Sequence, residues 1–367
     1  MAKPVLIFPG GMPRSLDFLQ QCLRQKRPAI GASSLGYDAA QVRFPAWVRL
    51  PYVTDPGFDA ALREVVAEHG IGEIYTPNIV VWNHLNQTLG EMGIDVVLAN
   101  ISPVDEALDP YRAALAKSRH FIADHYKMES DTPAAAWLSE IELAGLIRYA
   151  DGIPGMCDDF KLRALVEIAR YAVPGDVVEI GTWWGKSAFI LQRLAHCHGI
   201  GKLLCVDPWA NELLKQDEKL VDSGSEQVDA NEALEIFQIG LVPFNINHIN
   251  YLRMPSVAAA ARYRIGGPVC SAAFGITDYA GRISILHIDG NHAYESASAD
   301  VEAWSGLVGG GGWIIIDDYL WPYGDGPRRA GDEFLAANWN RISTAFVSGS
   351  ALFIRLVLAD AATSVKN

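Results

Sequence analysis

The chain has 367 residues, of which 50% are hydrophobic and 20% are charged, and its formal net charge is -13. This length predicts about two domains, and this composition predicts folded domains with sizeable cores rather than a disordered chain. The negative charge argues against nucleic acid and anionic membrane as partners, because both would be repelled.

The cysteine pattern and the N-terminal sequence indicate a cellular compartment. The five cysteines are scattered and include no C-x-x-C pair, which predicts reduced thiols rather than a zinc site or a disulfide framework. Pro4, Pro9 and Pro13 interrupt any signal-peptide pattern, and no apolar run approaches the roughly 20 residues of a membrane span. We therefore expect a soluble, cytoplasmic protein.

The first third of the sequence alternates short apolar runs with amphipathic ones. The apolar runs predict strands at Pro4–Phe8, Ala29–Ser33, Val48–Val53, Glu73–Thr76 and Val96–Ala99. The amphipathic runs predict helices at Ser15–Gln25 with Ser15 as N-cap, at Asp59–His69 with Gly70 as its stop, and around Val81–Met92. This alternation predicts a small parallel sheet covered by helices, which we assign to a domain of residues 1–102.

A mainly helical stretch then runs from about Pro103 to Ala172. Its clearest helices are expected at Tyr111–Tyr126 and Phe160–Tyr171, the second ending before Pro174. No low-complexity linker marks the domain boundary. We expect a helical connector over residues 103–152 and a second domain over residues 153–367.

The second domain again alternates strands and helices. We expect strands at Val177–Ile180, Leu203–Val206, Ile283–Ile288 and Trp313–Ile316, a helix at Lys186–Cys197 and a long polar insertion from about Trp209 to Gly240. The chain closes with Ser343–Val347 and Ala351–Leu356. These β-rich runs flank a tight Ser-Gly-Ser turn and predict a terminal hairpin.

Acidic residues follow the strands of the second domain where each strand ends. They are Glu179, Asp207, Asp289 and the pair Asp317-Asp318. In open parallel sheets, ligands bind outside the carboxyl ends of the strands, and uncompensated carboxylates gathered there repel one another. Helix caps explain one or two of these residues, so the set as a whole favours a ligand site.

The loop after the first of these strands has features of several nucleotide-binding motifs. The dinucleotide fingerprint G-x-G-x-x-G is absent, because Trp183 stands at its second glycine position. The residues Gly-Lys-Ser at 185–187 are similar to the end of a P-loop, and Ile314–Asp317 is similar to a Walker-B strand. However, Ile180 stands where the P-loop needs its first glycine, and two tryptophans would fill the phosphate space.

The pattern that is present is E-x-G-x-x-x-G, followed by an acidic residue at the next strand end. This pattern suits S-adenosylmethionine, a ligand without phosphate. Gly181 allows the backbone to approach the methionine moiety, and Asp207 can accept hydrogen bonds from both ribose hydroxyls.

The remaining acidic residues suggest a metal site. Asp289, Asp317 and Asp318 offer the oxygen ligands that Mg²⁺ or a similar cation prefers, and such an ion would lower the pKa of a substrate hydroxyl. His292 lies three residues after Asp289 and is a candidate general base. The alternatives are a helix cap at Asp289, a turn at Asp317-Asp318 and a surface or capping role for His292. We expect His287, inside its strand, to be a packed histidine.

These stretches resemble the class I methyltransferases, and more narrowly the macrocin O-methyltransferase and related antibiotic-biosynthesis families. The matching segments lie in the family's order within about residues 153–357, at residues 175–181, 205–209, 286–295 and 312–319. The resemblance implies a Rossmann-like α/β fold with a seven-stranded sheet that ends in the terminal hairpin. It also implies Mg²⁺-assisted O-methylation, with Asp289, Asp317 and Asp318 as the metal ligands. The cofactor contacts that we expect are Glu179, Gly181, Thr182, Trp183, Gly185, Ser187, Asp207, Trp209 and Asp289.

The N-terminal domain resembles the domain that precedes an ATP-grasp module in carboxylate–amine ligases. The ATP-grasp body itself is missing, since the methyltransferase-like segment begins where it would continue, and we expect no ligase activity. This domain would bind part of a substrate, a nucleotide-like group or another subunit.

The function expected from the sequence is methyl transfer from S-adenosylmethionine to a hydroxyl of a small molecule, such as a sugar or a natural-product intermediate. His292 and Asp289 are the expected catalytic residues, and we expect a homo-oligomer. The alternatives are a non-catalytic binding protein for S-adenosylmethionine or a nucleotide, and a P-loop phosphotransferase, which the missing glycine disfavours. Tyr319, Trp321 and Tyr323 are expected either to wall the acceptor pocket or to belong to the core.

Overall fold

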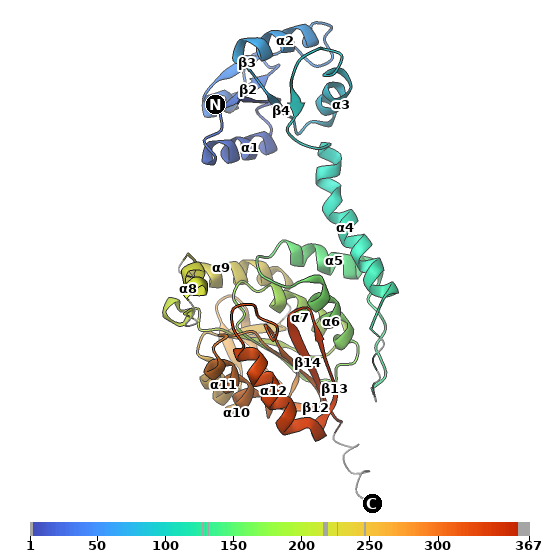
Figure 1. Cartoon of the computed structure of the whole chain (residues 1–367), viewed down its shortest axis with the longest axis vertical. Helices are drawn as coiled ribbons and strands as arrows, with labels where there is room; N and C mark the ends of the chain where they lie inside the picture. The colour runs from blue at the N-terminus through green and yellow to red at the C-terminus, as the bar shows by residue number, and fades with distance from the viewer. Residues whose placement is uncertain are drawn as a thin grey trace, which may run out of the picture. The chain divides into compact units, whose positions relative to one another are not determined.

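The computed structural model of the protein divides into two compact units, Met1–Ala113 and Ala114–Asn367, each built around a β-sheet (Figure 1). The structure describes residues 3–126, 128, 130, 132–215, 219–225, 227–245 and 247–358. The boundary between the units falls inside helix α4 (Pro103–Ala123).

The first unit contains a five-stranded sheet with the order β3-β2-β1-β4-β5 and parallel pairing throughout. Its strands and α-helices, in chain order, are β1 (Val5–Ile7), α1 (Pro13–Arg24), β2 (Ala29–Ser33), β3 (Trp47–Arg49), α2 (Phe58–His69), β4 (Glu73–Tyr75), α3 (Ile79–Thr88) and β5 (Val97–Leu98). Apolar residues of the sheet and helices form its cores. The small parallel sheet with covering helices that the sequence predicts is therefore confirmed.

Two local predictions for this unit are wrong. Ser15 is not the N-cap of α1, because the helix begins at Pro13, whose missing N–H suits the first helical position. The Ser15 hydroxyl instead donates a hydrogen bond to the Pro9 carbonyl at 2.6 Å. Strand β3 ends at Arg49, because Pro51 has no N–H with which to continue a ladder.

The second unit contains a seven-stranded sheet with the order β13-β14-β12-β11-β6-β7-β8. Strand β14 is antiparallel to both of its neighbours, and the other pairs are parallel. The strands are β6 (Asp176–Ile180), β7 (Leu203–Val206), β8 (Ile249–Leu252), β11 (Ile283–Ile288), β12 (Val308–Ile316), β13 (Ile342–Ser348) and β14 (Ala351–Leu356). The expected seven-stranded sheet and terminal hairpin are confirmed.

Helices cover both faces of this sheet. They are α5 (Glu140–Asp151), α6 (Asp159–Ala169), α7 (Lys186–Cys197), α8 (Lys219–Ser225), α9 (Ala230–Leu241), α10 (Ser256–Ile265), α11 (Tyr294–Ser305) and α12 (Gly326–Asn338), and a small hairpin pairs β9 (Val269–Ser271) with β10 (Gly275–Thr277). Successive strand residues point to opposite faces, so Val177 packs with α6, α7 and α9, and Val178 packs with α10, α11 and α12. Because helices cover both faces, the carboxyl ends of the parallel strands are the part of the sheet where a ligand can bind.

The insertion expected from Trp209 to Gly240 contains helices α8 and α9, and its residues 216–218 and 226 lie outside the described residues. Helix α9 begins after Asp229, whose carboxylate accepts the N–H groups of Asn231 and Glu232. Its buried face includes Phe237, which packs against the core of the second unit. The insertion is therefore partly a structural element of the second unit.

Asp176, at the start of β6, gives a test of the packing. Its buried carboxylate accepts hydrogen bonds from the Tyr263 hydroxyl at 2.5 Å, the Ala280 N–H at 3.0 Å and the Gly281 N–H at 2.9 Å. Asp176→Ala leaves these donors without a partner, and we expect the free energy of unfolding in urea to fall by about 3 kcal/mol. Tyr263→Phe removes a single donor and should cost about 1 kcal/mol. A smaller loss for Asp176→Ala than for Tyr263→Phe would contradict this account.

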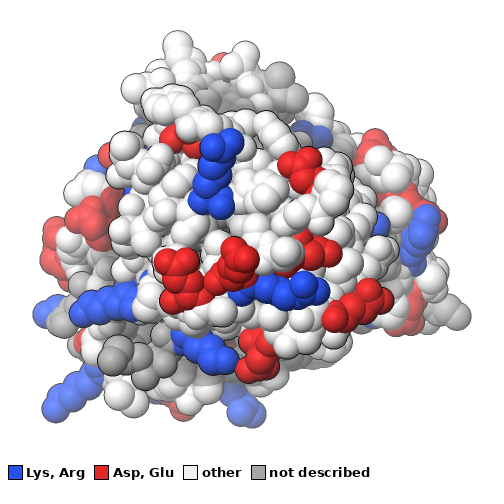
Figure 2. All heavy atoms as spheres, turned by 90° about the horizontal axis from the view of Figure 1, so that it is seen from above, with Lys and Arg blue, Asp and Glu red and all other residues white. Residues whose placement is uncertain are grey.

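In the part of the chain that the structure describes, no helix combines the length and the apolar character that a membrane span requires. Acidic and basic side chains are interspersed on the face that Figure 2 shows. Several charged side chains of the described residues form ion pairs, for example Arg27 with Glu73 at 2.7 Å.

Candidate active site

The register of the second sheet brings the acidic strand ends together. Strand β11 lies between β6 and β12, with Ile288 opposite both Ile180 and Ile316. Asp289 and Asp317 each come one residue after this row, and Asp207 follows β7 on the other side of β6. The acidic residues that the sequence places at strand ends therefore lie along one edge.

Gly181 lets two loops meet at this edge. Its φ is +79°, and a Cβ there would lie 1.9 Å from the carbonyl oxygen of Asp289. The Asp289 N–H also donates to the Ile180 carbonyl at 2.8 Å. The glycine is thus required by the close approach of the β6 and β11 loops, which the sequence pattern alone does not reveal.

Asp207 organises the loops that follow β6 and β7. Its carboxylate accepts the N–H of Trp183 at 3.0 Å and the N–H of Trp209 at 2.7 Å. Both tryptophans have positive φ angles, +51° and +39°, which these hydrogen bonds help to hold. Burial raises the pKa of the Asp207 carboxyl, and the two N–H donors partly oppose this rise.

The other expected cofactor residues differ in their exposure. Trp209 is fully buried, packs against Phe237 and Tyr251, and donates from Nε1 to the Trp183 carbonyl at 3.0 Å. Its side chain therefore belongs to the core. Thr182, Gly185 and Ser187 are also buried, whereas Gly181 and Trp183 are partly exposed.

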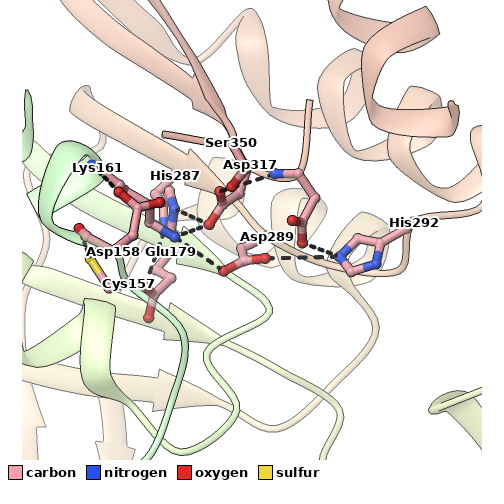
Figure 3. A network of polar contacts seen from close by, with 10 residues as sticks. Cys157, Asp158, Lys161, Glu179, His287, Asp289, His292, Asp317 and Ser350 are labelled. Carbon is pink, nitrogen blue, oxygen red and sulfur yellow. Dashed lines mark hydrogen bonds and ion pairs between the residues drawn. The ribbon is translucent and has the colours of Figure 1, made fainter. Parts of the chain in front are cut away.

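A polar cluster, which we call the inner group, lies at the neighbouring strands β11 and β12 and contacts Glu179 of β6 (Figure 3). The inner group consists of His287, Asp289 and Asp317, whose ligand atoms lie within 4.8 Å of one another. His287 Nδ1 lies 3.0 Å from Glu179 Oε1, and His287 Nε2 lies 3.5 Å from Asp317 Oδ2. Glu179 Oε2 has no hydrogen-bond partner among the described residues. His287 is buried, as the sequence predicts, but it joins two carboxylates rather than simply filling space.

Lys161, from helix α6, enters the inner group. Its ammonium contacts Asp317 Oδ2 and lies 3.7 Å from Asp289 Oδ2. Burial lowers the pKa of Lys161, but the negative charges around it, Asp289 first, outweigh burial and raise it. Burial raises the pKa of Asp289, and Lys161 and His292 together overcome that effect and lower it to about 2.

A second, more exposed set lies on the other side of Asp289, as Figure 3 shows. This outer group consists of Asp289, His292 and Asp318. His292 Nε2 lies 3.0 Å from Asp318 Oδ2 and 4.0 Å from Asp289 Oδ1. Burial lowers the pKa of His292, but the two carboxylates outweigh burial and raise it to about 9.

The outer group fits a hard divalent cation. Two carboxylates from neighbouring strand ends face each other there, and both are partly exposed, so an ion can reach them. Asp317, which the sequence analysis grouped with them, is buried and bonded elsewhere: Oδ2 contacts Lys161, and Oδ1 accepts from the Asp318 N–H and the Ser350 hydroxyl.

Aromatic side chains lie beside the outer group. The Trp321 ring centroid lies 4.6 Å from that of His292, and the Tyr323 ring lies 5.6 Å from Trp321. The Tyr319 hydroxyl points elsewhere and donates to Asp332 at 2.7 Å. Of the expected wall residues, Trp321 thus lies next to the candidate base, and Tyr323 packs against Trp321.

Part of the second unit matches a known family of protein domains. Residues 178–319 match the family model described as a methyltransferase domain. This segment contains the β6 loop, Asp207 and both groups of ligand atoms, but not Lys161. The second unit thus combines a seven-stranded α/β sheet, part of which matches a methyltransferase domain, with an acidic strand edge. No curated protein matches the chain.

Several solved structures are similar to this chain at low sequence identity. The O-methyltransferase NovP is 17% identical, with 54% of this chain and 80% of that chain covered and a TM-score of 0.37. The calicheamicin methyltransferase CalS11 is 13% identical, with coverage of 63% and 98% and a TM-score of 0.38. The mycinamycin-pathway methyltransferase MycE, in complex with Mg, SAH and mycinamycin VI, is 16% identical, with coverage of 63% and 56% and a TM-score of 0.38.

Proposed function

We propose that the protein transfers the methyl group of S-adenosylmethionine to a hydroxyl of a small-molecule acceptor, such as a sugar or a natural-product intermediate. The observation that carries this proposal is that two features lie on one edge of the sheet. They are the β6 and β7 loops, which Asp207 holds together, and the outer group of Asp289, His292 and Asp318. This edge lies within the segment that matches a methyltransferase domain.

The β6 and β7 loops would hold the cofactor. Asp207 keeps free lone pairs on both carboxylate oxygens after accepting the two loop N–H groups, so it can also accept from the ribose hydroxyls. The buried Glu179 Oε2 is an acceptor without a protein partner among the described residues and can serve a donor on the methionine moiety. We assign cofactor contacts to Glu179, Gly181, Thr182, Trp183, Gly185, Ser187, Asp207, Asp289 and the backbone of Trp209.

Asp289 and Asp318 would hold a divalent cation, which when bound lowers the pKa of the acceptor hydroxyl and fixes its oxygen. His292, beside them, takes the hydroxyl proton at Nε2 or Nδ1; the latter has no hydrogen-bond partner among the described residues. The acceptor oxygen then forms a bond to the methyl carbon while the carbon–sulfur bond breaks, and S-adenosylhomocysteine leaves as a neutral thioether. Asp289 keeps the proton-accepting imidazole oriented.

For the chain outside the catalytic segment we propose a supporting role. Residues 1–102 would recognise part of the acceptor or form contacts between subunits, residues 103–152 would connect, and residues 153–367 would carry the reaction. The parallel sheet of the first unit supports this division, because it forms its own core.

The first test is calorimetric titration of S-adenosylhomocysteine into the full-length protein, once with Mg²⁺ and once with a chelator. We expect saturable binding in both conditions, because the cofactor loops need no metal. Absence of binding to a folded sample would overturn the assignment and favour a binding protein for another ligand.

Metal removal should act on the reaction rather than on the cofactor. With an acceptor identified by screening sugars and phenols, we expect the chelator to lower the methyl-transfer rate at least tenfold, because a metal-polarised hydroxyl is easier to deprotonate. Excess Mg²⁺ should restore it. A rate that resists the chelator would refute the metal part of the proposal and leave the cofactor part standing.

A further inference from the structure

Lys161 lies within the inner group, which is more deeply buried than the outer group. Its side chain is 2% exposed and that of Asp317 is 5% exposed, whereas those of Asp289 and Asp318 are 22% and 26% exposed. A cation that approaches from solvent therefore meets the outer group first, and the inner group already contains a positive charge. A buried lysine persists only where carboxylates compensate its charge.

The backbone around Lys161 holds it in this position. The Asp158 carboxylate caps helix α6 by accepting the N–H of Phe160 at 2.7 Å and that of Lys161 at 2.9 Å. The Ser348 hydroxyl, at the end of β13, donates to the Phe160 carbonyl at 3.0 Å. The first turn of α6 is thus fixed to the terminal hairpin, and the lysine side chain has little freedom to leave the carboxylates.

The hydrogen bonds of Asp317 show how the position of Lys161 affects this carboxylate. Lys161 and His287 lie at one of its oxygens, and Ser350 and the Asp318 N–H donate to the other. With both oxygens engaged, Asp317 has little capacity to coordinate an ion. Asp289 differs, because only its Oδ2 faces Lys161, while its Oδ1 faces the outer group.

We propose that Lys161 is a built-in cation that fills the inner group, so that a divalent ion enters this protein through Asp289 and Asp318 and not through Asp317. Lys161 is then a positioning residue: it holds Asp289 in place for the outer group and limits the affinity for the ion by its charge. This inference rests on the proposed function, because it assigns the metal ligands of the same site.

The test measures binding of Mn²⁺ alone by electron paramagnetic resonance, without any turnover. Lys161→Met removes the ammonium, which frees Asp317 and relieves the repulsion of the ion. A unit positive charge a few ångströms from the ion weakens its binding substantially, so Mn²⁺ should bind Lys161→Met at least tenfold more tightly than the wild type. Unchanged or weaker binding would overturn the proposal. Lys117→Met is the matched control, since Lys117 pairs with the exposed Asp159 at 2.7 Å, and it should leave the affinity unchanged.

A double variant keeps the test decisive if Lys161→Met fails to fold. Lys161→Met with Asp317→Asn removes both charges of the pair and leaves no unpaired buried charge. We expect Mn²⁺ affinity within about threefold of the wild type, because the removed charges cancel. If Asp317 is a ligand, the double variant binds at least tenfold more weakly and the proposal is wrong.

The remaining outcomes are also informative. Absence of Mn²⁺ binding by the wild type overturns the proposal, whether or not Lys161→Met binds the ion. Titration of S-adenosylhomocysteine into the same samples tests the proposed function separately. Failure of that titration with the expected Mn²⁺ result would refute the methyltransferase assignment and leave the lysine-filled inner group in place.

Discussion

Asp207→Ala is expected to weaken the binding of S-adenosylhomocysteine by roughly 100-fold or more. The variant loses a charge-assisted acceptor for the two ribose hydroxyls, each such hydrogen bond contributing about 1.5–3 kcal/mol. It also releases the N–H groups of Trp183 and Trp209, which the carboxylate holds at 3.0 and 2.7 Å. Calorimetric titration of the full-length variant measures the effect.

A matched control separates cofactor recognition from general loss of a loop carboxylate. Asp38, in the first unit, also accepts a backbone N–H, that of Ala40 at 3.0 Å. Asp38→Ala should leave the affinity for S-adenosylhomocysteine within about twofold of the wild type. Wild-type affinity in Asp207→Ala would mean that the cofactor does not bind at the β6–β7 edge.

The sequence predicted best the segments whose pattern depends on sheet burial. Strands β7 and β11 have the predicted boundaries, because each is a largely apolar run that ends before an aspartate, and the amphipathic helix α7 also has its predicted boundaries. The hairpin of β13 and β14 was predictable for the same reason, since the Ser-Gly-Ser turn separates two β-rich runs.

Helix α9 and strand β8 were not predicted, because polar residues surround or interrupt their apolar patterns. Helix α9 lies in a segment that is polar on average, although Asp229 as a cap and the apolar spacing up to Leu241 were visible signals. Strand β8 is short and contains Asn250, a residue that is depleted in strands. In the structure, that amide side chain donates to the Val269 and Gly275 carbonyls, so its polarity is used within the fold.

The acidic edge was predictable because strand ends in a parallel sheet must meet, but Lys161 was not. It belongs to a predicted helix that precedes the sheet, and its partner Asp317 lies 156 residues further along the chain. A lysine in the first turn of an amphipathic helix normally faces water. Only the packing of α6 against the hairpin places its ammonium among the carboxylates, and no local pattern contains that information.

His292 should be protonated at neutral pH when no divalent ion is present. Burial lowers its pKa, but Asp289 and Asp318 outweigh burial and raise the pKa to about 9, so its proton is lost only as the pH rises through that value. We expect an NMR titration of the imidazole, in chelator, to give a midpoint near pH 9, well above the ordinary value of about 6.5. Added Mg²⁺ should move the midpoint to lower pH, because an ion on the same carboxylates repels the imidazolium. A midpoint near 6.5 in chelator would show that the ion pairs do not form.

The charge state of His292 determines the expected kinetics. A general base must be neutral, so methyl transfer should rise with pH and level off above the midpoint measured for the imidazole in Mg²⁺. His292→Gln should lower the rate at the plateau by roughly 100-fold or more and remove this pH dependence, while binding of S-adenosylhomocysteine stays unchanged. His84→Gln is the matched control, because His84 also pairs with a carboxylate, Asp59 at 2.7 Å, but lies in the first unit. Since a residue that only supports the fold would change the rate equally at every pH, an unaltered profile in His292→Gln would assign the proton to another group.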